Sequence, residues 1–378
     1  MQPTSLKNKK IICTVTNDLF RDGRMIRICN ALAEYGAQVC LTGVEKSGSL
    51  PLKKQKFEQK RMRLFFKKGM LFYMEYNLRL FFYLMKKDFD TVNSVDTDTV
   101  LAGFLAALLK RKKIVFDAHE YFTGVPELKG RVIKRKIWSL LEKIFLPRIK
   151  SNYTVSESLK SLYEAKTGRK YGVIRNFPSA SGYGISRIPK DLPCPESIQG
   201  KELIVYAGVL NAGRGLESSI EMMKYFDDKK HLLIVGGGDL EAELKRLAET
   251  YGVQNKVTFT GWVDAACIPS LIKGASIGLN LLDGDSVNYR VSLANKVFDY
   301  MHSGIPCLTM DFGEYRKIQD EYGCFILTDT LQPEELYHKI KSVLEGKNKF
   351  AELKANALKA AKDMVWEREK EKLLRYYS

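Results

Sequence analysis

Residue types that build disulfide frameworks and metal sites are scarce in this chain of 378 residues, and no secretion signal stands out. Its seven cysteines are scattered, odd in number and never spaced as CxxC pairs, and there are four histidines. Such spacing is not typical of a disulfide framework or a zinc site. The first residues lack the basic-then-apolar pattern of a signal peptide. We therefore expect reduced thiols in the core of a cytosolic protein.

Long hydrophobic runs are also missing. The most apolar segment, residues 70–84, is interrupted by Glu75, Asn77 and Arg79, so no window has the roughly 18–20 uninterrupted apolar positions of a membrane-spanning helix. The loop after the first expected strand, residues 17–24, is not a GxGxxG motif. We therefore expect no membrane span, and no dinucleotide site of the usual kind in this loop.

Positive charge is abundant and lies in one half of the chain. Residues 1–180 carry 35 Lys and Arg against 16 Asp and Glu, whereas residues 181–378 carry 26 against 28. Residues 53–68 hold eight basic residues and one acid, with Leu64, Phe65 and Phe66 among them. Together with the aromatic residues that follow at 70–84, it makes a basic, aromatic-rich helical segment that we expect to lie on an anionic membrane surface. The alternative is a solvated loop followed by ordinary core. Nucleic acid is not expected, because no recognised binding motif accompanies the charge.

Short apolar strands alternate with amphipathic helices in both halves, which is typical of parallel α/β sheets. Residues 178–200 gather proline, glycine and serine, as a linker does, and the charge balance changes there. We predict an α/β protein with two Rossmann-like parallel-sheet domains facing a central cleft. The expected boundaries are a first domain at 1–180, a linker at 181–200, a second domain at 201–362, and a C-terminal helix at 363–378 that returns to the first domain.

Polar residues follow two of the expected strands in the first half, where open α/β sheets bind ligands. The loop at 17–24 contains Gly23, which permits close approach of the backbone to a ligand, although a lone loop glycine is more often part of a turn. Asp117-Ala118-His119-Glu120 follows a later strand. A histidine beside two acids at a strand end is a site candidate, and a structural loop histidine is the alternative.

Glycines and cations collect at the strand ends of the second half. Residues 294–308 read as a helix with Lys296 and Asp299 near its start, closed by Gly304 and followed by a buried strand. The lysine reaches a phosphate and the carboxylate accepts from a ribose diol, or the two form a surface ion pair. Glycine loops at 208–215 and 236–238 offer bare N–H groups beside Arg214. Together they suit a diphosphate.

Several motifs resemble the donor-binding domain of retaining GT-B glycosyltransferases of family 4. These motifs are Tyr206-Ala207-Gly208-Val209-Leu210, Arg214-Gly215-Leu216-Glu217, Ile234-Val235-Gly236-Gly237-Gly238-Asp239, Phe259-Thr260-Gly261-Trp262-Val263 and Asn295-Lys296-Val297-Phe298-Asp299-Tyr300-Met301. The loops holding Arg24 and His119 are similar to that family's acceptor domain. The resemblance runs over nearly the whole chain and implies GT-B architecture.

The resemblance also implies an activity. A hexosyl-type sugar would pass from a nucleotide-diphosphate-sugar to a glycan or lipid-linked saccharide, with retention and without an essential metal or cofactor. Arg214 and Lys296 would neutralise the departing diphosphate, and His119 would lie near the transferred sugar. Gly23 and Arg24 would lie beside the phosphates. The positions implied to contact the donor within the second domain are Gly208, Gly236, Val263, Ser292, Asn295 and Asp299.

The sequence departs from the family pattern at two positions. Val291 stands where the first of two glutamates is frequent, and Val209 stands where an arginine is frequent. Asp283, Asp285 and Asp299 form no recognised metal-binding pattern, so we expect no metal. Two other functions stay open: a nucleotide-sugar epimerase of the same architecture, and a non-catalytic nucleotide-sugar-binding protein.

Overall fold

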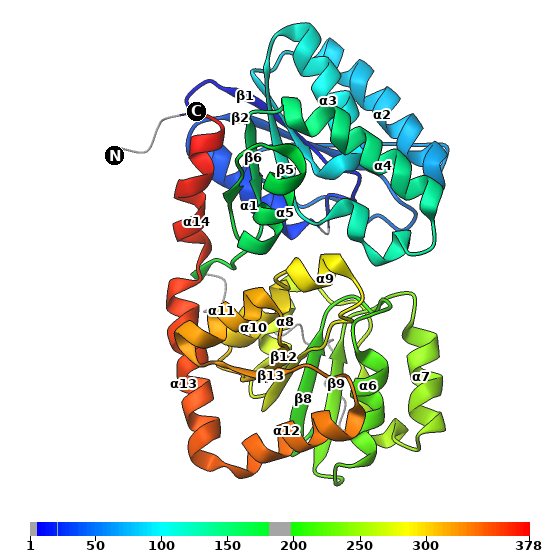
Figure 1. The fold of residues 1–378 in the computed structure, drawn as a ribbon, viewed down its shortest axis with the longest axis vertical. Coiled ribbons are helices and arrows are strands. Elements are labelled where there is room, and N and C mark those ends of the chain that lie inside the picture. The colour runs from blue at the N-terminus through cyan, green and yellow to red at the C-terminus, as the bar shows by residue number, and fades with distance from the viewer. Residues whose placement is uncertain (1–5, 21, 181–197) are drawn as a thin grey trace. The chain divides into compact units, whose positions relative to one another are not determined.

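The computed structural model describes residues 6–20, 22–180 and 198–378 (Figure 1). It divides the chain into two units: residues 1–176 together with 368–378 form unit 1, and residues 177–367 form unit 2. Most of the predicted linker at 181–200 lies outside the described residues. The C-terminal residues 368–378 belong to unit 1, where the hydroxyls of Tyr153 and Tyr377 are 2.8 Å apart.

Unit 1 is built on a parallel sheet of seven strands in the order β3-β2-β1-β4-β5-β6-β7. The strands are β1 (Lys10–Thr14), β2 (Gln38–Val44), β3 (Glu58–Met62), β4 (Thr91–Val95), β5 (Lys113–Ala118), β6 (Ser151–Thr154) and β7 (Gly172–Val173). The α-helices are α1 (Gly23–Glu34), α2 (Gly69–Lys86), α3 (Asp96–Lys110), α4 (Val132–Phe145) and α5 (Glu157–Thr167), with α14 (Trp366–Leu373) leading back from unit 2.

Unit 2 has a second parallel sheet, of six strands in the order β10-β9-β8-β11-β12-β13. The strands are β8 (Glu202–Ala207), β9 (Lys230–Val235), β10 (Val257–Phe259), β11 (Ile277–Asn280), β12 (Cys307–Met310) and β13 (Phe325–Thr328). The helices are α6 (Leu216–Glu221), α7 (Glu241–Thr250), α8 (Ile268–Ile272), α9 (Val287–Val291), α10 (Asn295–His302), α11 (Gly313–Tyr322), α12 (Pro333–Glu345) and α13 (Lys347–Asp363). Two parallel Rossmann-like sheets with helices confirm the predicted fold class.

The helix boundaries follow local rules in several places. The Asp22 carboxylate accepts a hydrogen bond from the Met25 amide and caps α1, and the Ser156 hydroxyl accepts from Leu159 and caps α5. Helix α10 ends before Gly304, whose φ of 65° lets the chain turn sharply into β12. The predicted glycine stop of this helix is therefore confirmed.

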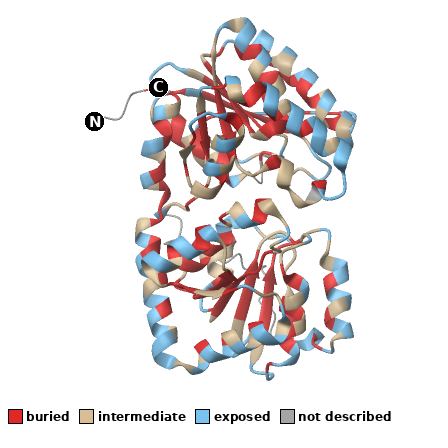
Figure 2. Ribbon diagram, viewed as in Figure 1, coloured by how far each residue is buried: buried red, intermediate tan, exposed pale blue. Residues whose placement is uncertain are grey.

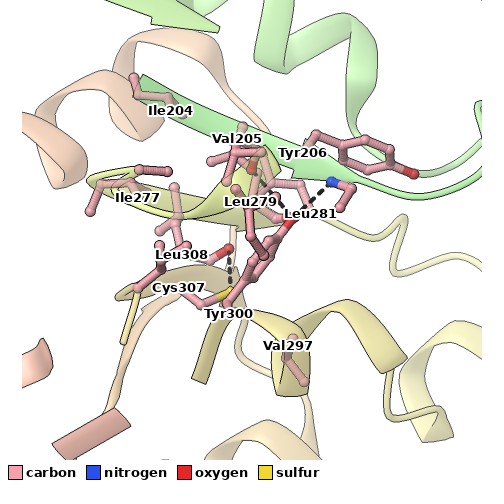
Figure 3. Packing of buried hydrophobic residues seen from close by; sticks show 14 of the residues in the cluster. Ile204, Val205, Tyr206, Ile277, Leu279, Leu281, Val297, Tyr300, Cys307 and Leu308 are labelled. Carbon is pink, nitrogen blue, oxygen red and sulfur yellow. Dashed lines mark hydrogen bonds between the residues drawn. The ribbon is translucent and has the colours of Figure 1, made fainter. Parts of the chain in front are cut away.

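Tyr300 anchors α10 to the sheet of unit 2. Its hydroxyl accepts a hydrogen bond from the Ala207 amide at 2.9 Å and lies 3.3 Å from the carbonyls of Val205 and Leu279 (Figure 3). The ring packs against Gly278, where an added Cβ would lie 2.4 Å from it. These contacts fix the start of α10 beside the carboxyl ends of β8 and β11.

The basic segment at 53–68 differs from its prediction. Residues 58–62 form β3, the edge strand of the unit 1 sheet, paired in parallel with β2. Arg61 makes an ion pair with Asp18 at 2.5 Å, and Arg63 pairs with Glu45 at 2.8 Å. The predicted helix is therefore confirmed for the aromatic part, which forms α2, whereas residues 58–62 form a strand because they pair with β2.

Two further expectations concern cysteines and membrane spans. The six described cysteines, Cys13, Cys29, Cys40, Cys267, Cys307 and Cys324, are free and buried, as expected of core thiols, and Cys194 lies outside the described residues. Among the described residues, no helix has the length and apolar character needed to cross a bilayer.

Candidate functional site

In unit 2, the glycine loops lie at the carboxyl ends of β8 and β9. Gly208 follows β8 and Gly236 follows β9, and the Gly208 amide donates to the Val235 carbonyl at 2.9 Å. A Cβ on Gly236 would lie 2.0 Å from the Gly208 carbonyl oxygen, and its φ of 137° is a conformation that other residues rarely adopt. The two loops therefore touch through bare backbone, which leaves their edge open for a ligand.

Lys296 lies in the first turn of α10 with its side chain buried, only 6% exposed. Its ammonium nitrogen lies 3.5 Å from the centroid of the Tyr206 ring and has no hydrogen-bond partner among the described residues. Burial, and to a lesser extent Arg214, hold the pKa of Lys296 well below its ordinary value. A buried ammonium without a partner is costly unless an anion completes its surroundings.

Arg214 lies in the loop between β8 and α6, next to Gly213 and Gly215. The phenol groups of Tyr206 and Tyr289 interact electrostatically with its guanidinium. Burial lowers the pKa of Arg214, but the two tyrosines raise it above its ordinary value overall. The Tyr289 hydroxyl also donates to the Ala212 carbonyl at 3.2 Å. The arginine is therefore held in place before any ligand arrives.

The other predicted contacts of the donor domain lie around this pair of cations. Asn295 is exposed at the start of α10, and Asp299 is half-buried one turn further along the helix. The Ser292 hydroxyl donates to the Tyr289 carbonyl at 3.0 Å, so it braces the loop that joins α9 to α10. Val263 is half-buried in the loop that follows β10. Gly208 is near Lys296, because a Cβ there would lie 3.6 Å from the ammonium nitrogen.

In unit 1, His119 lies just after β5 and contacts two carboxylates. Its Nε2 is 2.9 Å from an oxygen of the buried Asp117, and its backbone amide donates to Asp96 at 2.7 Å. Asp96 has a φ of 54°, a strained value for a residue with a side chain. The imidazole is thus oriented from two sides and stays partly exposed, as a group that meets a ligand must.

Arg24, which the family resemblance implies to lie beside the phosphates, contacts a buried carboxylate of its own unit. It is buried in unit 1, where one guanidinium nitrogen donates to Asp117 at 3.1 Å and another to the Ile174 carbonyl at 3.0 Å. Burial raises the pKa of Asp117, but Arg24 and His119 together lower it below its ordinary value. Arg24 therefore keeps Asp117 ionised beneath His119. Gly23, by contrast, is exposed at the start of α1.

Unit 1 also holds a pocket of about 310 Å³ at the carboxyl ends of β1 and β4. One wall is aromatic, with Tyr73 and Trp138 in edge-to-face contact at 4.9 Å between centroids. The carboxylates of Asp96, Asp98 and Glu120 line the pocket from the strand side, and Arg131 and Lys134 line it from α4. The sequence analysis missed this pocket, because its residues come from five separate segments.

Comparison with protein families gives two matches. Residues 24–177 match the model described as "Glycosyltransferase Family 4", and residues 193–360 match the model described as "Glycosyl transferases group 1". Together the two models span most of both units. A search of the curated proteins finds no match to this chain.

Solved structures with the same fold extend over nearly the whole chain. HepE of Anabaena, in complex with UDP-glucose, is 14% identical with a TM-score of 0.77 and covers 97% of this chain and 98% of its own. WaaG, described as a glycosyltransferase of lipopolysaccharide biosynthesis, is 15% identical with a TM-score of 0.72 over 97% and 98%. A putative UDP-N-acetylglucosamine 2-epimerase of Listeria monocytogenes is 13% identical with a TM-score of 0.61 over 92% and 91%. Likeness at this identity shows the fold alone.

Proposed function

Because the chain belongs to glycosyltransferase family 4, whose retaining GT-B enzymes transfer a sugar from a nucleotide-sugar, we propose a more specific reaction for it. Unit 2 binds a nucleotide-diphosphate-hexose without a metal, and unit 1 binds a glycan or lipid-linked saccharide acceptor at an anionic membrane surface. The observation that carries the donor assignment is the buried ammonium of Lys296, which has no hydrogen-bond partner among the described residues and interacts electrostatically with Arg214.

The two cations suit a departing diphosphate. When the glycosidic bond to the diphosphate breaks, negative charge grows on its oxygens, and fixed cations in a site shielded from water stabilise that charge. Desolvation disfavours the charged form of Lys296 in the free protein. A phosphate that pairs with this ammonium offsets that cost, and the pairing strengthens phosphate binding. The exposed Asn295 and the half-buried Asp299, further along α10, would bind the nucleoside side of the donor.

The pocket of unit 1 supports the acceptor assignment. Sugar rings stack on aromatic faces, and carboxylates accept hydrogen bonds from sugar hydroxyls, so Trp138 and Asp98 suit a saccharide. Arg131 and Lys134 suit the phosphate that links a saccharide to a lipid. His119, held by Asp117, would stand near the transferred sugar.

The outer face of helices α2, α3 and α4 supports docking on a membrane. These helices pack side by side on unit 1 (Figure 1), and Figure 2 shows exposed residues along them. Most exposed large apolar side chains of the described residues belong to them or to the residues just before α2: Phe65, Phe66, Leu71, Met74, Leu78, Phe82, Met85, Leu105, Leu108, Leu109, Val132, Ile133, Ile137, Leu140 and Ile144. An apolar face this large on a strongly basic unit matches an anionic bilayer.

The donor assignment is tested by thermal unfolding with UDP, GDP, ADP and CMP, with and without a chelator. One diphosphate should raise the unfolding temperature, since a ligand at about 100 times its Kd adds about 2.7 kcal/mol of stability. The Lys296→Met variant keeps the buried methylenes, so it should unfold no earlier than the wild type and lose the shift. The absence of a shift with every nucleotide, or a shift that Lys296→Met retains, would remove the assignment.

The membrane assignment is tested by vesicle binding. Binding to vesicles of phosphatidylglycerol and phosphatidylcholine should fall steeply with salt, because exposed charges are screened. The double variant Ile133→Ser, Leu140→Ser removes two exposed apolar side chains of α4 and should weaken binding at least about tenfold. Leu50→Ser, exposed in unit 1 outside the three helices, is the matched control and should bind normally. Equal binding of both variants would contradict the assignment.

Product analysis separates transfer from the two alternatives. An epimerase needs no acceptor, so the acceptor pocket and the apolar, basic face of unit 1 favour transfer. Incubation with a labelled nucleotide-sugar and membrane lipid should move label into lipid or glycan. Conversion of the donor to its epimer would favour the epimerase, and binding with no turnover of any kind would favour a binding protein.

A further inference from the structure

We propose that Tyr206 is a positioning residue of the donor site, which holds the two cations Lys296 and Arg214 in register for a diphosphate. This inference rests on the proposed function of unit 2. Tyr206 is the next-to-last residue of β8, fully buried, and the resemblance to the family assigns it no role. It contacts Lys296 and the adjoining glycine loop, and it interacts electrostatically with Arg214.

One side chain makes three separate contacts. The face of the Tyr206 ring lies 3.5 Å from the Lys296 ammonium, a short cation–π contact. The phenol group interacts electrostatically with the Arg214 guanidinium and raises the pKa of that arginine. The same hydroxyl donates to the Val209 carbonyl at 2.8 Å. Figure 3 shows the Tyr206 ring projecting from the end of β8.

The Tyr206 ring reduces the electrostatic cost of placing Lys296 near Arg214. Two cations buried close together repel each other, and Arg214 contributes to the lowered pKa of Lys296. The negative face of an aromatic ring stabilises a desolvated ammonium, and a phenol oxygen stabilises a guanidinium. Tyr206 thus offsets part of the cost of burying the Lys296 ammonium and holds its position for phosphate oxygens.

The contact with Val209 explains how the loop tolerates a sequence departure. Val209 occupies the position where an arginine is frequent in the family, so this loop lacks one cation. The Tyr206 hydroxyl donates a hydrogen bond to the Val209 carbonyl and so holds this backbone beside the site. Gly208 lies close to the side chains of Tyr206 and Lys296, because a Cβ added there would lie 3.3 Å from the phenol oxygen. The loop is held by the tyrosine at the point where the phosphates would lie.

The experiment compares Tyr206→Leu, Tyr206→Phe and Leu279→Ala with the wild type. Leu279→Ala damages the same core on the neighbouring strand β11 without touching either cation. Binding of inorganic pyrophosphate and of UDP is measured by calorimetry at several pH values between about 6 and 9, because the pKa of Lys296 is lowered. The ratio of variant to wild-type affinity cancels the titration of the ligand itself.

Tyr206→Leu should weaken pyrophosphate binding about tenfold or more, and the loss should grow with pH, because without the ring Lys296 loses its proton more readily. Tyr206→Phe keeps the ring, so its loss should be smaller and independent of pH. Leu279→Ala should leave the ratio near one. A pH-independent loss in Tyr206→Leu, or an equal loss in Leu279→Ala, would show that Tyr206 only packs.

Two further outcomes are distinguishable. If Tyr206→Leu does not fold, Tyr206→Met provides a ring-free variant for the same comparison. If the wild type binds pyrophosphate but never transfers a sugar, the proposed function falls while the role of Tyr206 is still tested. If the wild type binds neither pyrophosphate nor UDP, both proposals are overturned.

Discussion

Replacement of Asp98 by asparagine should make the protein more stable at neutral and alkaline pH. Asp98 lies in the first turn of α3, is 7% exposed and lines the pocket of unit 1. Its carboxylate accepts a hydrogen bond from the Thr16 hydroxyl at 2.5 Å. Burial raises the pKa of Asp98 to about 7, although the Thr16 hydrogen bond lowers it in part. Asparagine resembles the protonated form and keeps an oxygen for Thr16.

The sign follows from the two pKa values. The ordinary pKa of an aspartate is 3.8 and that of folded Asp98 is about 7, so between them the folded chain holds a proton that the unfolded chain has lost. The contribution of Asp98 to the free energy of unfolding is therefore fully present below about pH 4 and declines as the pH rises to 7. A difference of about three pKa units corresponds to ~4 kcal/mol. Asp98→Asn should remove that decline.

Urea unfolding followed by tryptophan fluorescence, at intervals from about pH 4 to pH 8, gives the difference in stability between Asp98→Asn and the wild type. The difference should move in favour of the variant as pH rises. Asp88→Asn is a control that should stay flat over this range, because Lys10 lowers the pKa of Asp88 from 3.8 and the contribution of this carboxylate is lost only in more acid solution. A difference for Asp98→Asn that stays flat with pH would refute the reasoning.

Two glycine substitutions should separate backbone strain from backbone access. Gly236→Ala should lower the free energy of unfolding by about 2 kcal/mol or more, because its Cβ would lie 2.0 Å from the Gly208 carbonyl oxygen at an unfavourable φ. Thermal unfolding measures this loss. An unchanged unfolding temperature would contradict the prediction. Gly23→Ala should change the free energy of unfolding by no more than about 0.5 kcal/mol, since only Arg27 comes within 4 Å of the new Cβ. If the backbone at Gly23 contacts the phosphates, the same substitution should slow sugar transfer.

Features set by short stretches of sequence could be predicted. The helix at 295–302 follows from its apolar spacing and ends at Gly304, and Lys296 indeed lies in its first turn. Strand-end glycines at 208 and 236 were identified because parallel strands bring their carboxyl ends to one edge. The order of strands and helices along the chain was enough to give the fold class.

Features set by contacts across the chain could not be predicted. Residues 58–62 carry the charge of a surface segment, yet pairing with β2 makes them a strand. The pocket of unit 1 joins Trp138 of α4 to Asp98 of α3, and no local pattern relates these residues. The role of Tyr206 was hidden because an aromatic residue at the end of a buried strand is usually core.

Arg24 shows how the structure adds a contact that a motif does not reveal. The family resemblance implies a place beside the phosphates, and the structure adds that a guanidinium nitrogen of Arg24 lies 3.1 Å from the buried Asp117, which needs a cation. With Arg24 present, Asp117 stays ionised and binds the imidazole of His119 at 2.9 Å. Arg24 therefore acts on the candidate site of unit 1 through Asp117 and His119.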